Sequence, residues 1–133
     1  MRQAGNRGPH PPAILTGVFT LEEARAIMSE LRGDIDELLV LRADLAEIQA
    51  DLLHAGTSAL GGLADAKGLE ARFYAGIEAL GVKGAEVKGI APLLLDFPGE
   101  RDRVPVLWCW LEGDEQIAWY HRADCGFPGR RPV

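Results

Sequence analysis

Residues 21–53 carry apolar side chains at a repeat of seven, and no other feature of the sequence constrains the fold as strongly. The repeat consists of Ala24, Leu31, Leu38, Leu45 and Leu52. Thr20 and Glu23 are spaced as a capping box, so we expect a helix to begin near residue 21 and to run to about residue 53. A seam of this kind lets a helix pack lengthwise against another helix.

The length of this helix limits how it can be accommodated. A straight helix over residues 21–53 would span roughly 50 Å, whereas a compact chain of 133 residues has a diameter of about 35–40 Å. Two outcomes are open: the helix breaks near Gly33, where glycine costs about 1 kcal/mol relative to alanine, or another subunit covers its apolar stripe. We favour the second outcome and expect a homodimer.

A second helix is predicted over residues 63–80. One of its faces is apolar and consists of Ala66, Leu69, Phe73, Ile77 and Leu80. Gly76 lies beside this face, where the missing side chain permits a neighbouring element to approach closely. Gly81 is expected to end the helix as a left-handed cap. The short connection between the two helices predicts an antiparallel helical hairpin.

After residue 80 the pattern changes from helical to β-type. Strands are expected at about 91–97, 104–111 and 116–122, with turns at "PGERDR" and "EGDE". The predicted fold class is therefore α+β: a long N-terminal antiparallel helical hairpin followed by a small antiparallel β-meander of about three strands. We expect residues 13–133 to form one domain, preceded by a flexible tail at residues 1–12.

The last two strands allow a register to be predicted. A two-residue turn at Gly113 and Asp114 would place Trp108 opposite Trp119. One face would then hold Val106, Trp108, Trp110, Ile117, Trp119 and His121, and the other Leu107, Cys109, Leu111, Ala118 and Tyr120. A bulge in the turn would shift the register and exchange these faces.

The charge distribution narrows the classes of partner. The net charge is −6, and residues 21–55 contain nine Asp or Glu against three Arg. This acidity argues against nucleic acid, whose phosphates require a basic surface. No stretch approaches the roughly 20 apolar residues needed to span a membrane. The N-terminus does not resemble a signal peptide, and two cysteines are typical of reduced thiols, so a cytoplasmic location is expected.

Two side chains are candidates for catalysis. His121 ends an apolar strand, where an imidazole serves either as a base or ligand or as a structural group bonded to the backbone. Asp96 follows three leucines in a strand that should be buried, so its carboxylate needs a partner. The available partners are Arg103, Arg130, Arg131 and His121. A structural ion pair and a functional acid both fit this pattern.

Candidates for binding a small acidic ligand lie in the same region. Trp108 and Trp119 form either a ligand platform or ordinary core packing. Arg130 and Arg131 suit carboxylate or phosphate, and salt bridges with the acidic helix are the alternative.

The two cysteines allow further interpretations. Cys109 is expected to be a small buried apolar residue, and Cys125 an accessible thiol. No metal and no cofactor is expected. A zinc site made of Cys109, His121 and Cys125 stays open as an alternative, although its spacing is not a metal signature.

Three segments together resemble a known family. "FTLEEARAI", "LLLDFP" and "LWCWLEGDEQIAWYHRADCGFPGRRPV" are similar to the prokaryotic family of uncharacterised proteins catalogued as domain-of-unknown-function family 2203, over about Val18 to Pro132. The resemblance implies no activity or cofactor. The family pattern draws attention to Asp96, Pro98, Cys109, Trp110, His121, Gly126, Phe127, Gly129 and Arg130, without a role for any of them.

Three functions remain open at this point. The first is a homo-oligomeric interaction or ligand-binding module, assembled through the long acidic helix. The second is a small enzyme or metal-binding protein with a site around His121, Asp96 and an arginine of the tail. The third is a redox-sensing protein that acts through Cys125.

Overall fold

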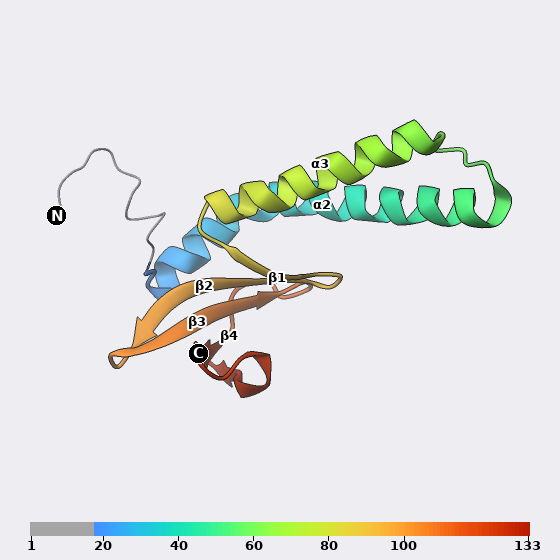
Figure 1. The fold of residues 1–133 in the computed structure, drawn as a ribbon. Coiled ribbons are helices and arrows are strands. Elements are labelled where there is room, and N and C mark those ends of the chain that lie inside the picture. Colours follow the sequence, from blue (N-terminus) through green and yellow to red (C-terminus); the bar gives the residue numbers. More distant parts are fainter. Residues whose placement is uncertain (1–17) are drawn as a thin grey trace. The chain divides into compact units, whose positions relative to one another are not determined.

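The computed structural model describes residues 18–133 and has the predicted α+β architecture (Figure 1). A helical hairpin is followed by an antiparallel sheet. The expected tail at residues 1–12 lies outside the described residues. The chain divides into two compact units. The helical unit is residues 31–79, and the sheet unit combines residues 18–30 with residues 80–133.

The first helix, α2, spans Leu21–Ala55 without interruption. Its start is the predicted capping box: the Thr20 backbone N–H donates to Glu23 Oε1 at 2.8 Å, and the Glu23 N–H donates to Thr20 Oγ1 at 3.0 Å. The helix continues through Gly33, so the break considered from the sequence does not occur. Within the described chain, neither this helix nor the next is apolar enough over its length to cross a membrane.

The helical unit is an antiparallel hairpin of α2 and α3 (Leu63–Val82). The repeat positions of α2 are buried there, including Leu31, Leu38 and Leu45. A core cluster joins the two helices and contains Leu45, Ile48 and Ala66, with Leu52 and Leu69 packed against it. A Cβ at Gly76 would overlap the Leu38 side chain, which confirms the close approach predicted at this glycine. The part of the stripe from Leu38 to Leu52 is thus covered by α3, and the homodimer stays a prediction.

The second helix ends two residues later than the sequence indicated, and its cap lies at a different glycine. The residue with positive φ is Gly84 (φ 110°), whereas Gly81 lies inside the helix. The Ala85 N–H donates to the Leu80 carbonyl at 3.2 Å, and the Gly84 N–H donates to the Gly81 carbonyl at 3.1 Å. This pair of bonds is the Schellman arrangement, which satisfies the last carbonyls of the helix.

The sheet contains five antiparallel strands in the order β1-β2-β3-β4-β5, two more than the sequence predicted. The strands are β1 (Glu86–Ile90), β2 (Leu93–Arg101), β3 (Val104–Leu111), β4 (Trp119–Arg122) and β5 (Arg131–Pro132), with a short 3₁₀ helix, η1 (Phe127–Gly129), before β5. The additional strands are the glycine-containing segment before Leu93 and two residues of the tail. Both lie at the edges of the sheet, where the apolar pattern is weakest.

The predicted register between β3 and β4 is wrong by one residue. Cys109 pairs with Trp119, and Leu107 pairs with His121. The connection is not a two-residue turn but a loop over residues 112–118. Asp114 closes this loop: its carboxylate accepts from the Leu111 N–H at 3.0 Å. Because side chains alternate along a strand, the shift moves His121 from the face of the tryptophans of β3 to the face of Cys109.

One face of the sheet forms the core of the sheet unit, and we call it the helix face. Phe97 of β2 meets Phe19 edge-on, with ring centroids 6.0 Å apart. The Trp108 indole N–H donates to the Phe19 carbonyl at 2.8 Å and passes directly over Gly99. A Cβ at Gly99 would overlap this indole nitrogen, so the contact requires glycine. Phe19, which directly precedes α2, is therefore bonded and packed to the sheet. The buried polar side chains lie on the opposite face.

Candidate functional site

The opposite face, here called the site face, gathers Asp96, Cys109 and His121 from three adjacent strands. Asp96 on β2 lies directly opposite Cys109 on β3, and His121 on β4 lies diagonally from Cys109. One ligand atom from each of the three side chains lies within 4.8 Å of the other two. The three residues are 2%, 1% and 3% exposed, respectively. The register of the strands thus builds a buried polar triad.

His121 has a defined orientation within the triad. Its Nδ1 lies 2.9 Å from the backbone carbonyl of Arg122. A carbonyl oxygen only accepts hydrogen bonds, so Nδ1 must carry a hydrogen and donate it. The other nitrogen, Nε2, points at Asp96 Oδ2 at 3.4 Å. A bare Nε2 lone pair facing a carboxylate oxygen is repulsive, so a hydrogen-bond donor or a metal ion between the two atoms would stabilise this arrangement.

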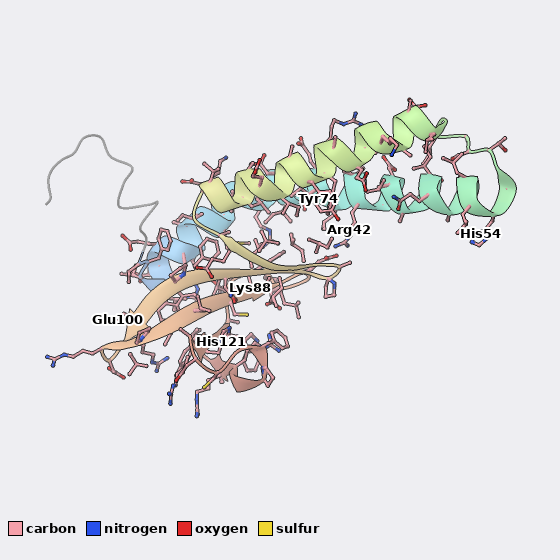
Figure 2. The ribbon with its side chains drawn as sticks, in the orientation of Figure 1. Arg42, His54, Tyr74, Lys88, Glu100 and His121 are labelled. Atoms are coloured by element: carbon pink, nitrogen blue, oxygen red, sulfur yellow. The ribbon has the colours of Figure 1, made fainter. Side chains whose placement is uncertain are left out.

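Asp96 is the acceptor at the centre of the site. Its Oδ2 faces His121 and also lies 3.3 Å from Lys88 Nζ, which reaches in from β1 (Figure 2). Its Oδ1 is buried and makes no hydrogen bond. A buried carboxylate oxygen without a hydrogen bond costs free energy, so a water molecule or an ion bound at this oxygen would stabilise the site.

Cys109 is a protonated thiol in this environment. Burial, and then the negative charge and hydrogen bond of Asp96, raise the pKa of the Cys109 thiol to about 12. The thiol is therefore not a nucleophile at neutral pH, because the thiolate is the reactive form. A cation that binds between Cys109 and Asp96 would displace this proton, as metal ions do at cysteine ligands.

The other predicted ligand-binding residues are divided between the two faces of the sheet and its tail: Trp119 pairs directly with Cys109 on the site face, and the positive charge of Arg130 acts to lower the pKa of the Cys109 thiol. Trp108 is buried on the helix face. Trp119 is half-buried, and the Arg130 guanidinium lies 4.9 Å from its ring and 4.1 Å from the ring of Phe127. Arg131 is exposed in β5. Roles of these residues in binding an acidic ligand stay predictions.

Cys125 is exposed, and its Sγ lies 3.7 Å from Asp124 Oδ1. Among the described residues, the cluster with metal-ligand geometry contains Asp96 with Cys109 and His121, and not Cys125. The observed cluster therefore differs from the zinc set considered from the sequence in one residue: Asp96 takes the place of Cys125.

His121 is one of the four partners that the sequence left open for Asp96, and the structure places it 3.4 Å from that carboxylate. Two members of the site, Cys109 and Lys88, were not predicted beside Asp96. Cys109 was placed on the other face by the register error, and shifting the strands by one residue would have recovered it. Lys88 was not considered, because it follows from a bulge: pairing passes from Val87–Leu95 to Gly89–Leu94 and leaves Lys88 as the extra residue. Its neighbour Gly89 is the only local signal for that bulge.

Comparison with known proteins gives one match. The family model described as "Uncharacterized conserved protein (DUF2203)" matches residues 17–133, which includes every residue of the site. No curated protein and no solved structure matches the chain significantly. The match extends over most of the chain, so the protein belongs to the DUF2203 family.

Proposed function

We propose that this protein binds a divalent transition-metal ion between Asp96, Cys109 and His121. The orientation of His121 carries the proposal: Nδ1 is committed to a carbonyl, and Nε2 is aimed at a carboxylate 3.4 Å away. Histidines that ligate metals commonly donate their other ring N–H to a backbone carbonyl, which holds the free nitrogen toward the ion. The unpartnered Oδ1 of Asp96 supplies a second ligand atom.

The distances in the triad suit a small tetrahedral site. Metal bonds of about 2.0–2.1 Å to nitrogen and oxygen, and about 2.3 Å to sulfur, place neighbouring ligand atoms about 3.3–3.6 Å apart. The His121–Asp96 distance of 3.4 Å already falls in this range. The ligand atoms of the triad lie within 4.8 Å of one another. Atoms at that separation would have to approach by about 1 Å to share a metal ion, which is a shift on the scale of a small side-chain rotation.

The donor set favours one class of ion. One sulfur, one imidazole nitrogen and one carboxylate oxygen suit Zn²⁺, Co²⁺ or Fe²⁺, whereas Ca²⁺ and Mg²⁺ prefer oxygen alone. Three protein ligands leave the fourth position of a tetrahedral ion to water or another small ligand. The residues themselves are at most 3% exposed, which favours binding over turnover of a substrate at His121.

A cobalt titration tests the proposal. The protein is stripped with a chelator and titrated with Co²⁺, whose absorption reports both thiolate ligation and tetrahedral geometry. We expect one equivalent to bind, with a thiolate-to-cobalt charge-transfer band and intense visible bands. Cys125→Ser is the matched control and should give the same spectrum, because Cys125 lies outside the triad. Absence of the charge-transfer band in the wild type would favour a protonated His121 as the species facing Asp96.

Self-association through the helical hairpin is a second proposal. It is supported by the exposed leucines that flank the loop between the helices: Leu53 is 78% exposed and Leu63 is 66% exposed. A second copy of this chain that packs its hairpin end-on would cover both side chains. Light scattering coupled to size-exclusion chromatography should then report a dimer, and Leu53→Lys should shift it toward the monomer. A monomer at every concentration would remove the proposal.

A further inference from the structure

Lys88 is the member of the site that reaches solvent. Its side chain is 42% exposed, whereas those of Asp96 and His121 are 3% and 4% exposed. Its Nζ lies between two carboxylates, 3.3 Å from Asp96 Oδ2 and 3.4 Å from Glu86 Oε1. The Glu86 side chain is itself 47% exposed. The Lys88 ammonium therefore contacts one carboxylate inside the site, that of Asp96, and one at the surface, that of Glu86.

The position of Lys88 arises from the bulge in β1. The extra residue in the strand brings the lysine to the edge of the triad, and bulges often serve to re-aim a side chain beside a functional site. Glu86 pairs directly with Asp96 across the strands. The sheet therefore fixes the positions of both residues whose carboxylates contact Lys88.

We propose that Lys88 is the gate of the metal site: its ammonium holds Asp96 in the metal-free protein and moves to Glu86 when the ion binds. This inference rests on the proposed metal-binding function. The Lys88 ammonium and a divalent ion would compete for the Asp96 carboxylate. Because both are positively charged, they repel each other when they contact the same carboxylate. Lys88 would thus lower the affinity for metal and neutralise Asp96 when no metal is present.

The size of the effect follows from exposure. A buried lysine at this distance would weaken metal binding by several orders of magnitude, but Lys88 is 42% exposed and is screened by water. We therefore expect removal of its charge to tighten Zn²⁺ binding by about 10-fold. Loss of the hydrogen bond from Lys88 to Asp96 acts in the other direction but is smaller, because His121 still faces the same oxygen.

Competition with a chromophoric chelator measures the Zn²⁺ affinity of each variant at fixed pH. Lys88→Met should bind about 10-fold more tightly than the wild type, and the difference should shrink at high salt. Lys88→Arg should remain close to the wild type. Lys67→Met, at an exposed lysine of α3, is the matched control and should change nothing. Glu86→Gln should weaken binding, because Lys88 loses its surface acceptor.

The outcomes separate the two proposals. If the wild type binds no zinc, the metal-binding function fails and the gate fails with it. If the wild type binds zinc and Lys88→Met binds equally or more weakly, the metal site stands and the gate is wrong. In that case Lys88 supports Asp96 as a ligand instead of competing for it.

Discussion

Replacing Cys109 by serine should remove most of the stabilisation that zinc confers. Cys109 is 1% exposed, and a serine hydroxyl at this position can donate a hydrogen bond to the neighbouring Asp96 carboxylate. The substitution is nearly isosteric, so in the presence of EDTA we expect a loss of only about 1 kcal/mol in the free energy of unfolding. The loss of a metal ligand is much larger. Structural zinc sites contribute about 10–16 kcal/mol over four ligands, so one ligand is worth about 3–4 kcal/mol, or roughly 10²–10³-fold in affinity.

These values predict the outcome of unfolding in urea. At a free zinc concentration about 100 times the wild-type Kd, zinc should raise the free energy of unfolding of the wild type by about 2.7 kcal/mol. For Cys109→Ser the same concentration is about 0.1–1 times Kd, and the gain falls to at most about 0.4 kcal/mol. Cys125→Ser should respond as the wild type does. Equal stabilisation of the wild type and Cys109→Ser by zinc would refute a thiolate ligand.

Three further predictions concern the fold. In the metal-free native protein, a thiol reagent should modify Cys125 rapidly and Cys109 only after denaturation, because only Cys125 is exposed; two fast thiols would contradict the burial. Gly99→Ala should cost about 2–4 kcal/mol in urea unfolding, because a Cβ would displace the Trp108 indole; a loss below about 1 kcal/mol would show that the contact is soft. Arg103→Gly should raise the free energy of unfolding by about 0.5–1 kcal/mol, because Arg103 has a φ of 68° in the β2–β3 turn; a decrease would contradict strain there.

The helical part of the fold follows from local sequence. The capping box fixes the start of α2, and the repeat of seven fixes which side of the helix is buried. What covers that side is a tertiary question: α3 does so through Gly76 and the cluster around Ile48. The repeat alone does not distinguish a covering helix of the same chain from one of another subunit.

The site was less accessible from sequence because it depends on register. A strand pattern of period two specifies two faces but not their alignment with the next strand, and one residue of slip exchanges them. The loop at residues 112–118 sets this alignment, through the carboxylate of Asp114. Asp96 and His121 were nevertheless identified, because a carboxylate and an imidazole in apolar strands need partners wherever they lie. Cys109 and Lys88 carry no such signal, since a cysteine suits a core and a lysine suits an edge strand.

X-ray absorption at the zinc edge tests the metal site most directly, because it measures the ligand atoms and their distances in the loaded protein. We predict one sulfur at about 2.3 Å and nitrogen or oxygen ligands at about 2.0–2.1 Å, which correspond to Cys109, His121 and Asp96. The sulfur contribution should vanish in Cys109→Ser and persist in Cys125→Ser. A zinc spectrum that contains only nitrogen and oxygen ligands, or one whose sulfur survives in Cys109→Ser, would contradict the proposed site.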